Sequence, residues 1–500
     1  MIADHSEIEM SLHSSLNVIS KHYKDDQDDA SEDKVEIWDG VWKLIALTFF
    51  SAGGLLLRKS TDTMNYFVIG RFGDPALVSG AALGNITTSM TSLSLGVGFT
   101  GAIETLSSQA FGNKKNCLAG LYFTRAQVFF TFALIPICIF LWNCESFYIY
   151  VGQDPEVAQH AAVYIRAFLP ATWMFCQCEC LRKFLAAQGD FTFMARIQVL
   201  TAVLHPFWLF CAYYFDLSIR GVAFSSMITH SLNFLIPYIW IWIDNSKVKP
   251  GSWNMVDKES FKGMYEFLSL AIPSYLNIAL EIWSFQTMHI MCGYLGVAQL
   301  GASAITGNLF SVSFMIPLGI SFVSSSLIGN SLGASKPKSA MTYTRIALSL
   351  TFIFSTINVT LLFLLRKQLA HLFTTDEGIS SYIITSMPVF ISYLIGDYLQ
   401  CTMGGIIKAM GLQRYCTPIC LIGYWILSVP IGYYLAFCKN LDMKGVWAGM
   451  PVAMLFICVC FSLIIFSRDY EKLSDQIVLK LEKQKSQNHD KNLDKSEVNP

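Results

Sequence analysis

The sequence predicts an all-α polytopic membrane protein, with twelve transmembrane helices arranged as two pseudo-symmetric six-helix lobes. Three observations predict this fold. Hydrophobic residues make up 53% of the 500 residues and charged residues only 14%, whereas soluble domains carry roughly 25% charged residues. About twelve apolar stretches reach the length of about 20 residues that lets a helix cross a bilayer. Patterns of the first half also recur in the second half.

The spans follow from apolar runs and from the polar, Gly or Pro breaks between them. The first lobe, 41–243, is predicted to hold helices at 41–70, 76–108, 117–142, 158–186, 192–214 and 220–243. The second lobe, 262–467, is predicted to hold helices at 262–293, 298–331, 341–365, 378–408, 414–438 and 444–467. Residues 244–261 form the longest internal polar stretch, which we interpret as the linker between the lobes.

Both ends of the chain are rich in charge and poor in aromatic residues. This composition predicts a disordered acidic tail over 1–40 and a second disordered tail over 468–500. The polar start differs from a cleavable signal peptide, which has a basic start and a short apolar core. We therefore expect the first spanning helix to serve as the insertion signal.

The distribution of Lys and Arg between the loops predicts the orientation. One set of loops is rich in these residues: Lys114, Lys115, Arg182, Lys183, Arg196, Lys247, Lys249, Lys258, Lys262, Lys336, Lys338, Arg345, Lys408 and Arg414. The opposite set has few: Arg71, Arg220, Arg366, Lys367, Lys439 and Lys444. The richer set should face the cytoplasm, together with the linker and both termini, in a plasma, vacuolar or other internal membrane.

An internal duplication links the two lobes at an offset of about 220 residues. Matching positions are Gly84-Asn85 with Gly307-Asn308, Gln109 to Gly112 with Asn330 to Gly333, Asp154 with Asp376, Gly189 with Gly411, Pro206 with Pro430, and Gly221-Val222 with Gly445-Val446. Six helices is an even number, so both halves insert in the same direction as parallel repeats. Such lobes enclose a cleft that rocking exposes to each side in turn, which predicts a transporter working as a monomer.

Several motifs carry a family resemblance. Residues 101–112 (GAIETLSSQAFG) closely resemble the second-helix signature of the multidrug and toxic compound extrusion (MATE) family. Residues 151–156 and 182–189 resemble the segments that flank the family's fourth helix. Residues 317–321 and 329–334 resemble its eighth-helix signature, and 402–405 with Gly411 resemble its tenth. The resemblance spans residues 42 to 467 and is closest to the eukaryotic branch.

This resemblance implies a twelve-helix, two-lobed fold with no cofactor. It also implies the export of small organic compounds, cationic or polyaromatic, by alternating access. Such export is driven by an inward proton or sodium gradient, and eukaryotic members usually use protons. We therefore expect H⁺ as the coupling ion, with Na⁺ as the alternative.

Two carboxylates are predicted to carry proton and substrate exchange. Glu281 lies deep in the seventh helix, where an ionisable group is costly to bury and indicates function. A carboxylate there can hold a proton or neutralise a cationic substrate but not easily both, and that competition couples antiport. By the resemblance, Glu281 matches the family's seventh-helix carboxylate, and Asp397 matches an acidic position in the tenth helix. The alternatives are a hydrogen-bonded, structural role for Glu281 and a capping or packing role for Asp397.

Two positions depart from the eukaryotic pattern. Gln286 and Asn308 stand where multidrug members of that branch often have Glu. Both replacements keep hydrogen bonding and lose charge. The predicted pocket is thus less acidic, and a neutral or anionic substrate becomes more plausible.

The first lobe has its own polar candidates. Asn65 stands where many prokaryotic relatives have a coupling Asp. Asp62 lies three residues earlier on roughly the same helix face, and Arg58 lies four residues before Asp62. Asp62 could therefore couple ions, or it could form a local ion pair with Arg58.

Other residues are weaker candidates. The cleft could be lined by Trp283, Phe285 and Phe310, because aromatic faces bind cations, although aromatic residues also pack against lipid. Asn85 is a further candidate for the cleft lining. Arg182 and Lys183 are expected to extend to the cytoplasmic interface. Glu104, Gln109 and Asn330 are expected to stabilise helix ends.

The sequence also argues against several classes of protein. It has no P-loop, nucleophile elbow or zinc motif, so we expect neither an enzyme nor an ATP-driven pump. The three cysteines of 176–180 are two residues apart on a helix and cannot easily converge on a metal, and no basic run indicates nucleic acid. The open alternatives are a sodium-coupled exporter, an organic-anion exporter, a lipid-linked oligosaccharide flippase and a non-transporting receptor.

Overall fold

The computed structural model describes residues 35–72, 75–373 and 376–497. Within these ranges the secondary structure is helical and includes no strand. Ten helical segments in the described part of the chain are long and apolar enough to cross a membrane. The helical segment 75–112 and the helix α8 are also long enough, which gives the twelve predicted spans. Most of the predicted tail 1–40 lies outside the described residues.

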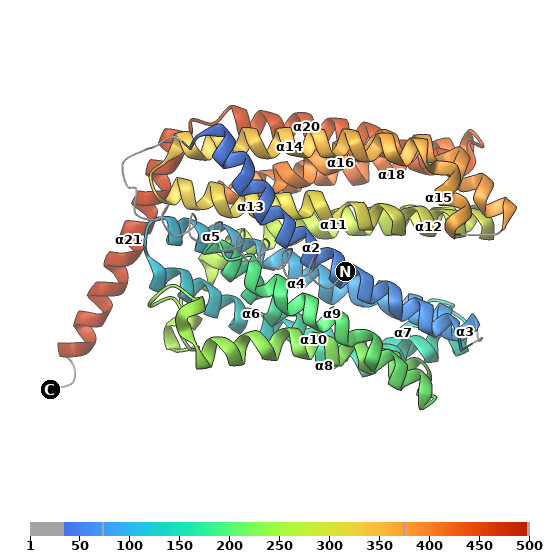
Figure 1. Cartoon of the computed structure of the whole chain (residues 1–500), viewed down its shortest axis with the longest axis horizontal. Helices are drawn as coiled ribbons and strands as arrows, with labels where there is room; N and C mark the ends of the chain where they lie inside the picture. Colours follow the sequence, from blue (N-terminus) through green and yellow to red (C-terminus); the bar gives the residue numbers. More distant parts are fainter. Residues whose placement is uncertain (1–34, 73–74, 374–375, 498–500) are drawn as a thin grey trace, which may run out of the picture.

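The helices form two layers that correspond to the two halves of the chain (Figure 1). The first lobe consists of α2 (Ile37–Gly70), α3 (Pro75–Thr88), η1 (Ser89–Leu93), α4 (Ser94–Phe99), α5 (Gly101–Gly112), α6 (Asn116–Trp142), α7 (Cys144–Tyr150), α8 (Pro155–Ala187), α9 (Thr192–Tyr214) and α10 (Ser218–Ile243). The linker carries two 3₁₀ turns, η2 (Asn245–Lys247) and η3 (Lys258–Phe261).

The second lobe repeats this order and ends in an additional helix. It consists of α11 (Met264–Leu295), α12 (Val297–Ser313), α13 (Met315–Gly333), α14 (Pro337–Leu364), α15 (Arg366–Phe373), α16 (Glu377–Ala409), η4 (Gln413–Tyr415), α17 (Cys416–Cys420), η5 (Leu421–Ser428), α18 (Val429–Tyr433), η6 (Tyr434–Cys438), α19 (Asp442–Trp447), α20 (Gly449–Phe466) and α21 (Tyr470–Glu497).

The second and eighth spans, predicted as continuous helices, are interrupted in the structure. The second contains a π-helical turn at Ser89–Leu93 and a break at Thr100. Hydroxyl groups around these points bond to the backbone of the preceding turn, as Thr100 does to Gly96, and such bonds compete with the helical ladder. In the eighth span, Pro317 has no N–H for the carbonyl of Ser313, and the helix breaks at Phe314.

The internal repeat is visible in the backbone. Non-glycine residues with positive φ occur at matching positions of the two lobes: Lys114 with Ser335, Asp216 with Asn440, and Ser218 with Asp442. The aspartates that the sequence paired also have the same role, because Asp154 and Asp376 each accept backbone N–H bonds at the start of a helix. Left-handed residues are uncommon outside glycine, so this correspondence supports a true duplication.

The lobes meet at the end of the molecule where α5 and α13 cross. Gly112 packs on the backbone of Asn330, and Gly333 packs on the backbone of Gln109. Two equivalent hydrogen bonds also cross between the lobes here. Gln109 Nε2 donates to the Ala409 carbonyl at 2.8 Å, and Asn330 Nδ2 donates to the Ala187 carbonyl at 2.8 Å. The contact therefore lies on the pseudo-two-fold axis that relates the lobes.

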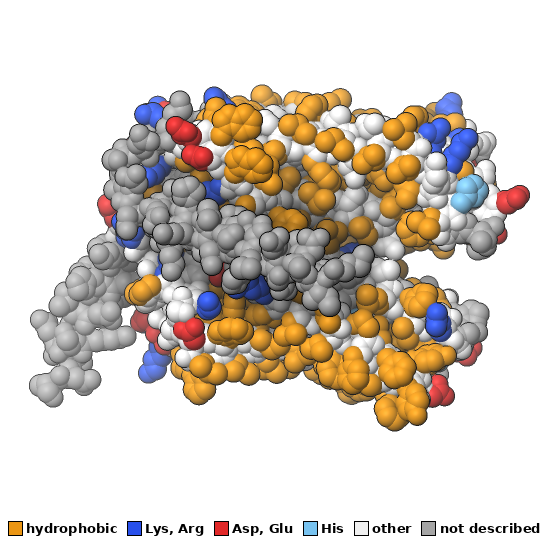
Figure 2. All heavy atoms as spheres, viewed as in Figure 1, with side chains coloured by type: hydrophobic (Ala, Val, Ile, Leu, Met, Phe, Trp, Pro, Cys, Tyr) orange, Lys and Arg blue, Asp and Glu red, His pale blue; other side chains and the backbone are white. Residues whose placement is uncertain are grey.

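The first helix of each lobe also reaches the other lobe. In α2, Ala52 lies against Gly319 of α13, and in α11, Tyr275 lies against Gly98 of α4. These two contacts are again equivalent under the repeat. At the opposite end the surface is hollowed between the lobes (Figure 2). The molecule is thus closed at the end that carries α21 and open at the end that carries α7 and α15.

The structure differs from the sequence prediction at 468–500, where most of the predicted disordered tail is the helix α21. Four residues spaced as one helical stripe are buried on the second lobe: Tyr470, Ser474, Ile477 and Leu481. Ser474 Oγ donates to the Leu332 carbonyl at 2.7 Å, and Lys480 Nζ lies 2.8 Å from Glu266. Burial raises the pKa of Tyr470 to about 12. The helix was not predicted because this buried stripe contributes few apolar residues to a tail that is mostly charged and polar.

Candidate functional site

Two carboxylates of the second lobe form the first group of site residues. Glu281 of α11 is half-buried, and Asp397 of α16 is buried. The charge of Glu281 acts on Asp397, so the two lie within electrostatic reach of each other. Gln400, one turn after Asp397, donates from Nε2 to Glu281 Oε2 at 3.4 Å. Asp397 Oδ1 is buried and has no hydrogen-bond partner among the described residues.

A π-helical segment supports this pair. The helix preceding α18 is π-helical over Leu421–Ser428, a form that is rare and frequent at functional sites. Trp425 in this segment donates from Nε1 to the Leu280 carbonyl at 3.1 Å, directly before Glu281. The π-helical segment therefore fixes the backbone that carries the carboxylate.

The polar candidates of the first lobe lie in a separate buried network. Asn65 of α2 donates from Nδ2 to Ser226 Oγ at 2.8 Å, and its Oδ1 lies 3.0 Å from His205 Nε2. The other ring nitrogen of His205 lies 2.8 Å from Thr229 Oγ1. The ring is 1% exposed. One imidazole thus joins α2, α9 and α10.

We expect His205→Ala to destabilise the first lobe by ~2–4 kcal/mol, because it leaves a cavity and deprives Asn65 and Thr229 of a partner. The measurement is thermal unfolding of the purified protein in detergent. His205→Gln, which can still bond both neighbours, should cost less. His371→Ala, at an exposed position, is the control. Equal melting temperatures for His205→Ala and the native protein would contradict the bridging role.

Arg58 pairs with Glu179 and not with Asp62, its partner in one of the two roles predicted for Asp62. Arg58 Nη1 lies 2.6 Å from Glu179 Oε1 of α8, and Arg182 pairs with the other oxygen of the same carboxylate. Asp62 is half-buried one turn before Asn65. Arg58 and Arg182 thus share one buried carboxylate.

Lys183 does not extend to the membrane interface as the sequence predicted. It is 1% exposed, and its Nζ lies 2.9 Å from Glu104 Oε2. Arg182 is 11% exposed and bound to Glu179, so it does not extend to the interface either. Both side chains remain inside because acidic partners from the same lobe neutralise them.

The aromatic candidates mostly belong to the core of the second lobe. Phe310 is 5% exposed and packs on Phe390, with ring centroids 5.4 Å apart. Phe285 packs on the buried Trp447, with centroids 5.9 Å apart. The structure therefore places Phe310 away from any open surface and Phe285 at the edge of the aromatic core.

The remaining candidates differ in their exposure. Asn308 is exposed, whereas Gln286, Trp283 and Asn85 are half-buried. No group of His, Cys, Asp and Glu side chains within the described residues could hold a metal ion. Of the predicted site residues, Glu281 and Asp397 form a group in the second lobe and Asn65 joins a buried network in the first.

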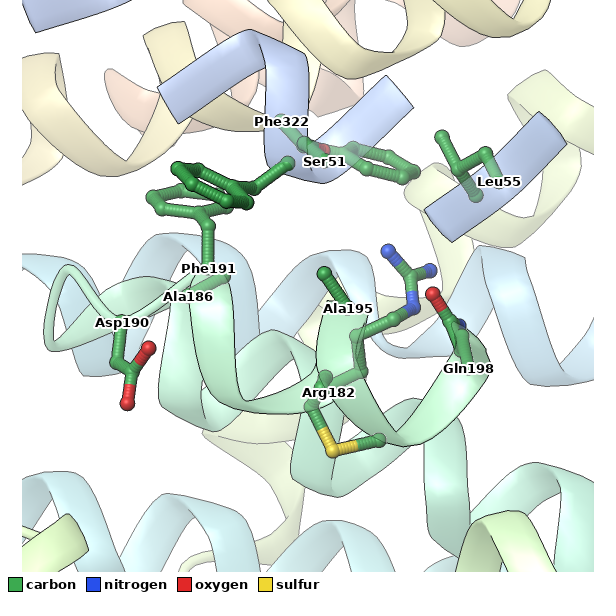
Figure 3. Close-up of a pocket in the computed structure, with 11 residues that line it drawn as sticks. Ser51, Leu55, Arg182, Ala186, Asp190, Phe191, Ala195, Gln198 and Phe322 are labelled. Atoms are coloured by element: carbon green, nitrogen blue, oxygen red, sulfur yellow. The ribbon is translucent and has the colours of Figure 1, made fainter. Parts of the chain in front are cut away.

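A small pocket lies beside the lobe contact, between α2, α8, α9 and α13. Arg182, Gln198 and Phe322 are among the residues that line it, and Figure 3 shows the Arg182 guanidinium and the Gln198 amide pointing toward α2. Its volume is about 20 Å³, room for about one water molecule. This pocket is too small for an organic substrate.

Comparison with known proteins agrees with the two-lobed geometry. The profile of the MatE family matches residues 54–210 and 273–434, one segment in each lobe. The chain belongs to the MatE family. Members of this family are transporters rather than enzymes and need no cofactor.

Curated relatives include plant and animal proteins. The chain is 27% identical to Protein DETOXIFICATION 16 of Arabidopsis thaliana over 438 residues, covering 86% of this chain and 89% of the relative. It is also 27% identical to human Multidrug and toxin extrusion protein 1 over 395 residues, covering 77% and 68%. The chain is therefore an integral, multi-pass membrane protein.

Solved MatE structures share the fold. The eukaryotic transporter AtDTX14 superimposes with a TM-score of 0.80 at 22% identity, covering 88% of this chain and all of that one. The Vibrio cholerae transporter VcmN in its bent form superimposes with a TM-score of 0.76 at 18% identity, covering 89% and 99%. The twelve-helix, two-lobed fold predicted from the sequence is thus confirmed.

Several residues of this MatE protein were not predicted from the sequence. Gln400 and Trp425, which hold Glu281, are ordinary in composition and lie more than 100 residues from it. His205 was also missed, although a single His within an apolar span was an available signal. The buried role of Lys183 required a partner 79 residues away.

Proposed function

We propose that this chain is a secondary active transporter that exports small organic compounds, cationic or polyaromatic, in exchange for protons. The observation that carries the proposal is the Glu281–Asp397 pair in a two-lobed transporter that is open at one end. The names of the relatives, multidrug and toxin extrusion protein and DETOXIFICATION, support the export of foreign compounds.

The exchange follows from competition at one site. Two carboxylates in a poorly hydrated environment repel each other when both are ionised. A proton or an organic cation relieves this repulsion, and each excludes the other. Gln400 remains a hydrogen-bond donor to Glu281 in either state. Proton entry therefore releases the cation, and cation binding releases the proton.

We infer that the closed end faces the cytoplasm. The start of α2 packs on α14 there, since Gly40 contacts Tyr343 and Ile346, and α21 docks at the same end. The lysine-rich loops, including Lys114 and Lys336, also lie there, which supports a cytoplasmic location. Both termini would then be cytoplasmic and the cleft open to the outside or to a vacuolar lumen. Each chain contains both lobes, so a monomer suffices.

The test is uptake of a fluorescent organic cation into inside-out proteoliposomes under an imposed pH gradient. Uptake driven by the pH gradient is the expected result. Uptake driven only by a sodium gradient would contradict proton coupling and leave export in place. Uptake of an organic anion alone would contradict the cationic substrate, and the uncharged Gln286 and Asn308 make that control necessary. Transport of none of these compounds would contradict the proposal.

A further inference from the structure

The ion pair between Glu104 and Lys183 lies where the two lobes meet. Glu104 belongs to α5 and Lys183 to α8, both in the first lobe, and Lys183 Nζ lies 2.9 Å from Glu104 Oε2. The side chains are 5% and 1% exposed. A buried ion pair of this kind tolerates the loss of both charges far better than the loss of one.

A phenylalanine of the other lobe packs over this ion pair. Phe322 of α13 places its ring centroid 3.1 Å from Lys183 Nζ and 4.7 Å from the Arg182 guanidinium. A cation over an aromatic face is stabilised by the ring, and more so when water is absent. Figure 3 shows Phe322 at the pocket beside Arg182. Separation of the lobes at this end therefore takes the aromatic face away from Lys183.

The neighbours of the pair make the lobe contact itself. Thr105, next to Glu104, donates to the Lys408 carbonyl of the other lobe at 2.7 Å. Ala187, one turn after Lys183, accepts from Asn330 of the other lobe at 2.8 Å. The pair is thus enclosed by bonds that exist only while the lobes touch here.

The Glu104 carboxylate has one oxygen that only the ion pair compensates while the lobes are closed. Glu104 Oε1 is buried and has no hydrogen-bond partner among the described residues. A carboxylate oxygen in this condition retains only its ion pair as compensation for lost hydration. Closure of the lobes is therefore possible only while Lys183 balances the charge.

We propose that Glu104, Lys183 and Phe322 form a charge-matched seal that holds the lobes closed at the α21 end. Glu104 and Lys183 are positioning residues, because they permit dry contact between α8 and α13 without touching the transported compound. The role of the seal in transport rests on the proposed alternating access.

The experiment measures lobe separation directly, without transport. Spin labels are introduced as noncanonical amino acids, because the fourteen cysteines of the chain complicate thiol attachment. Exposed positions at the closed end are Ser246, whose segment is tied to the first lobe through Gln188, and Arg414 of the second lobe. The distance between the labels is then measured in nanodiscs by double electron–electron resonance.

We expect each single variant of the ion pair to separate the lobes at this end and the double variant to keep them closed. Glu104→Gln or Lys183→Met leaves one buried charge, and we expect the population with separated labels to rise about tenfold or more. The double variant removes both charges and should return to the native distribution. Phe322→Leu keeps an apolar side chain without a ring face and should open partially.

The control is a half-buried ion pair of the same lobe, remote from the lobe contact. Arg166 lies 3.0 Å from Glu145 with 35% and 32% of the side chains exposed, so Arg166→Met should leave the distribution unchanged. Native distances in both single variants would overturn the proposal. A double variant as open as the single ones would also overturn it, because packing and not charge balance would then be the cause. If a single variant fails to fold, the exchanged pair Glu104→Lys with Lys183→Glu decides, and the proposal requires native closure.

Discussion

Glu281→Gln is expected to abolish uptake driven by a pH gradient, reducing it to the level of vesicles without protein. The substitution keeps the shape of the side chain and the hydrogen bond with Gln400, but it removes the group that exchanges a proton for a cation. Asp397, which already lies within reach of Glu281, then has no second carboxylate with which to share a proton. The measurement is the initial rate of uptake of a fluorescent cation into inside-out proteoliposomes.

The matched control for this prediction is Glu377→Gln. Glu377 begins α16, the helix that carries Asp397, and is exposed at the open end of the molecule. Its loss should leave uptake unchanged. Native uptake by the Glu281 variant would show that the residue is structural, and the coupling group would then have to be sought at Asp397 or Asp62.

Gly333→Ala is expected to have the second large effect, on the closed end. A Cβ at this position collides with the carbonyl carbon and oxygen of Gln109, and neither belongs to a flexible side chain. Overpacking of this kind typically costs about 1–3 kcal/mol, enough to invert two conformations separated by a few kcal/mol. We expect faster hydrogen–deuterium exchange in segments 105–113 and 326–334.

Two further glycines make this prediction specific. Gly112→Ala should give the same result, because its Cβ meets the Asn330 backbone in the equivalent contact. Gly404→Ala is the control, since a Cβ at Gly404 has nothing within 4 Å. Similar exchange rates in the Gly333 and Gly404 variants would contradict a close backbone contact on the axis.

The number of helices and the internal repeat could be predicted from the sequence because both are local signals. Spans are set by about 20 consecutive apolar residues, and matching residues such as Asp154 and Asp376 perform the same capping role in each lobe. The breaks at Thr100 and Phe314 were missed because single hydroxyl groups and one proline interrupt otherwise apolar runs. The helix α21 was missed because one buried stripe is hidden in a charged tail.

The candidate site was predicted only in part. The ionisable residues inside spans, Glu281 and Asp397, were found because their burial is expensive wherever they point. Their partners could not be found, because Gln400 and Trp425 reach Glu281 through tertiary contacts over more than 100 residues. The same limit explains Arg58, whose partner Glu179 is 121 residues away, and Lys183, which pairs inside the lobe.

The reciprocal contact between Gly112 and Gly333 has a consequence for the origin of the chain. In an isologous interface, the same patch of each subunit serves as both surface and partner. Gln109 and Asn330 have equivalent roles here, since each donates to the carbonyl of the last residue of a long helix in the opposite lobe. A six-helix ancestor carrying one copy of this patch could have assembled as a symmetric homodimer, and fusion of two genes would have required no new surface. Every difference between the two copies, from the carboxylates of one lobe to the imidazole of the other, is then a later specialisation of a single surface.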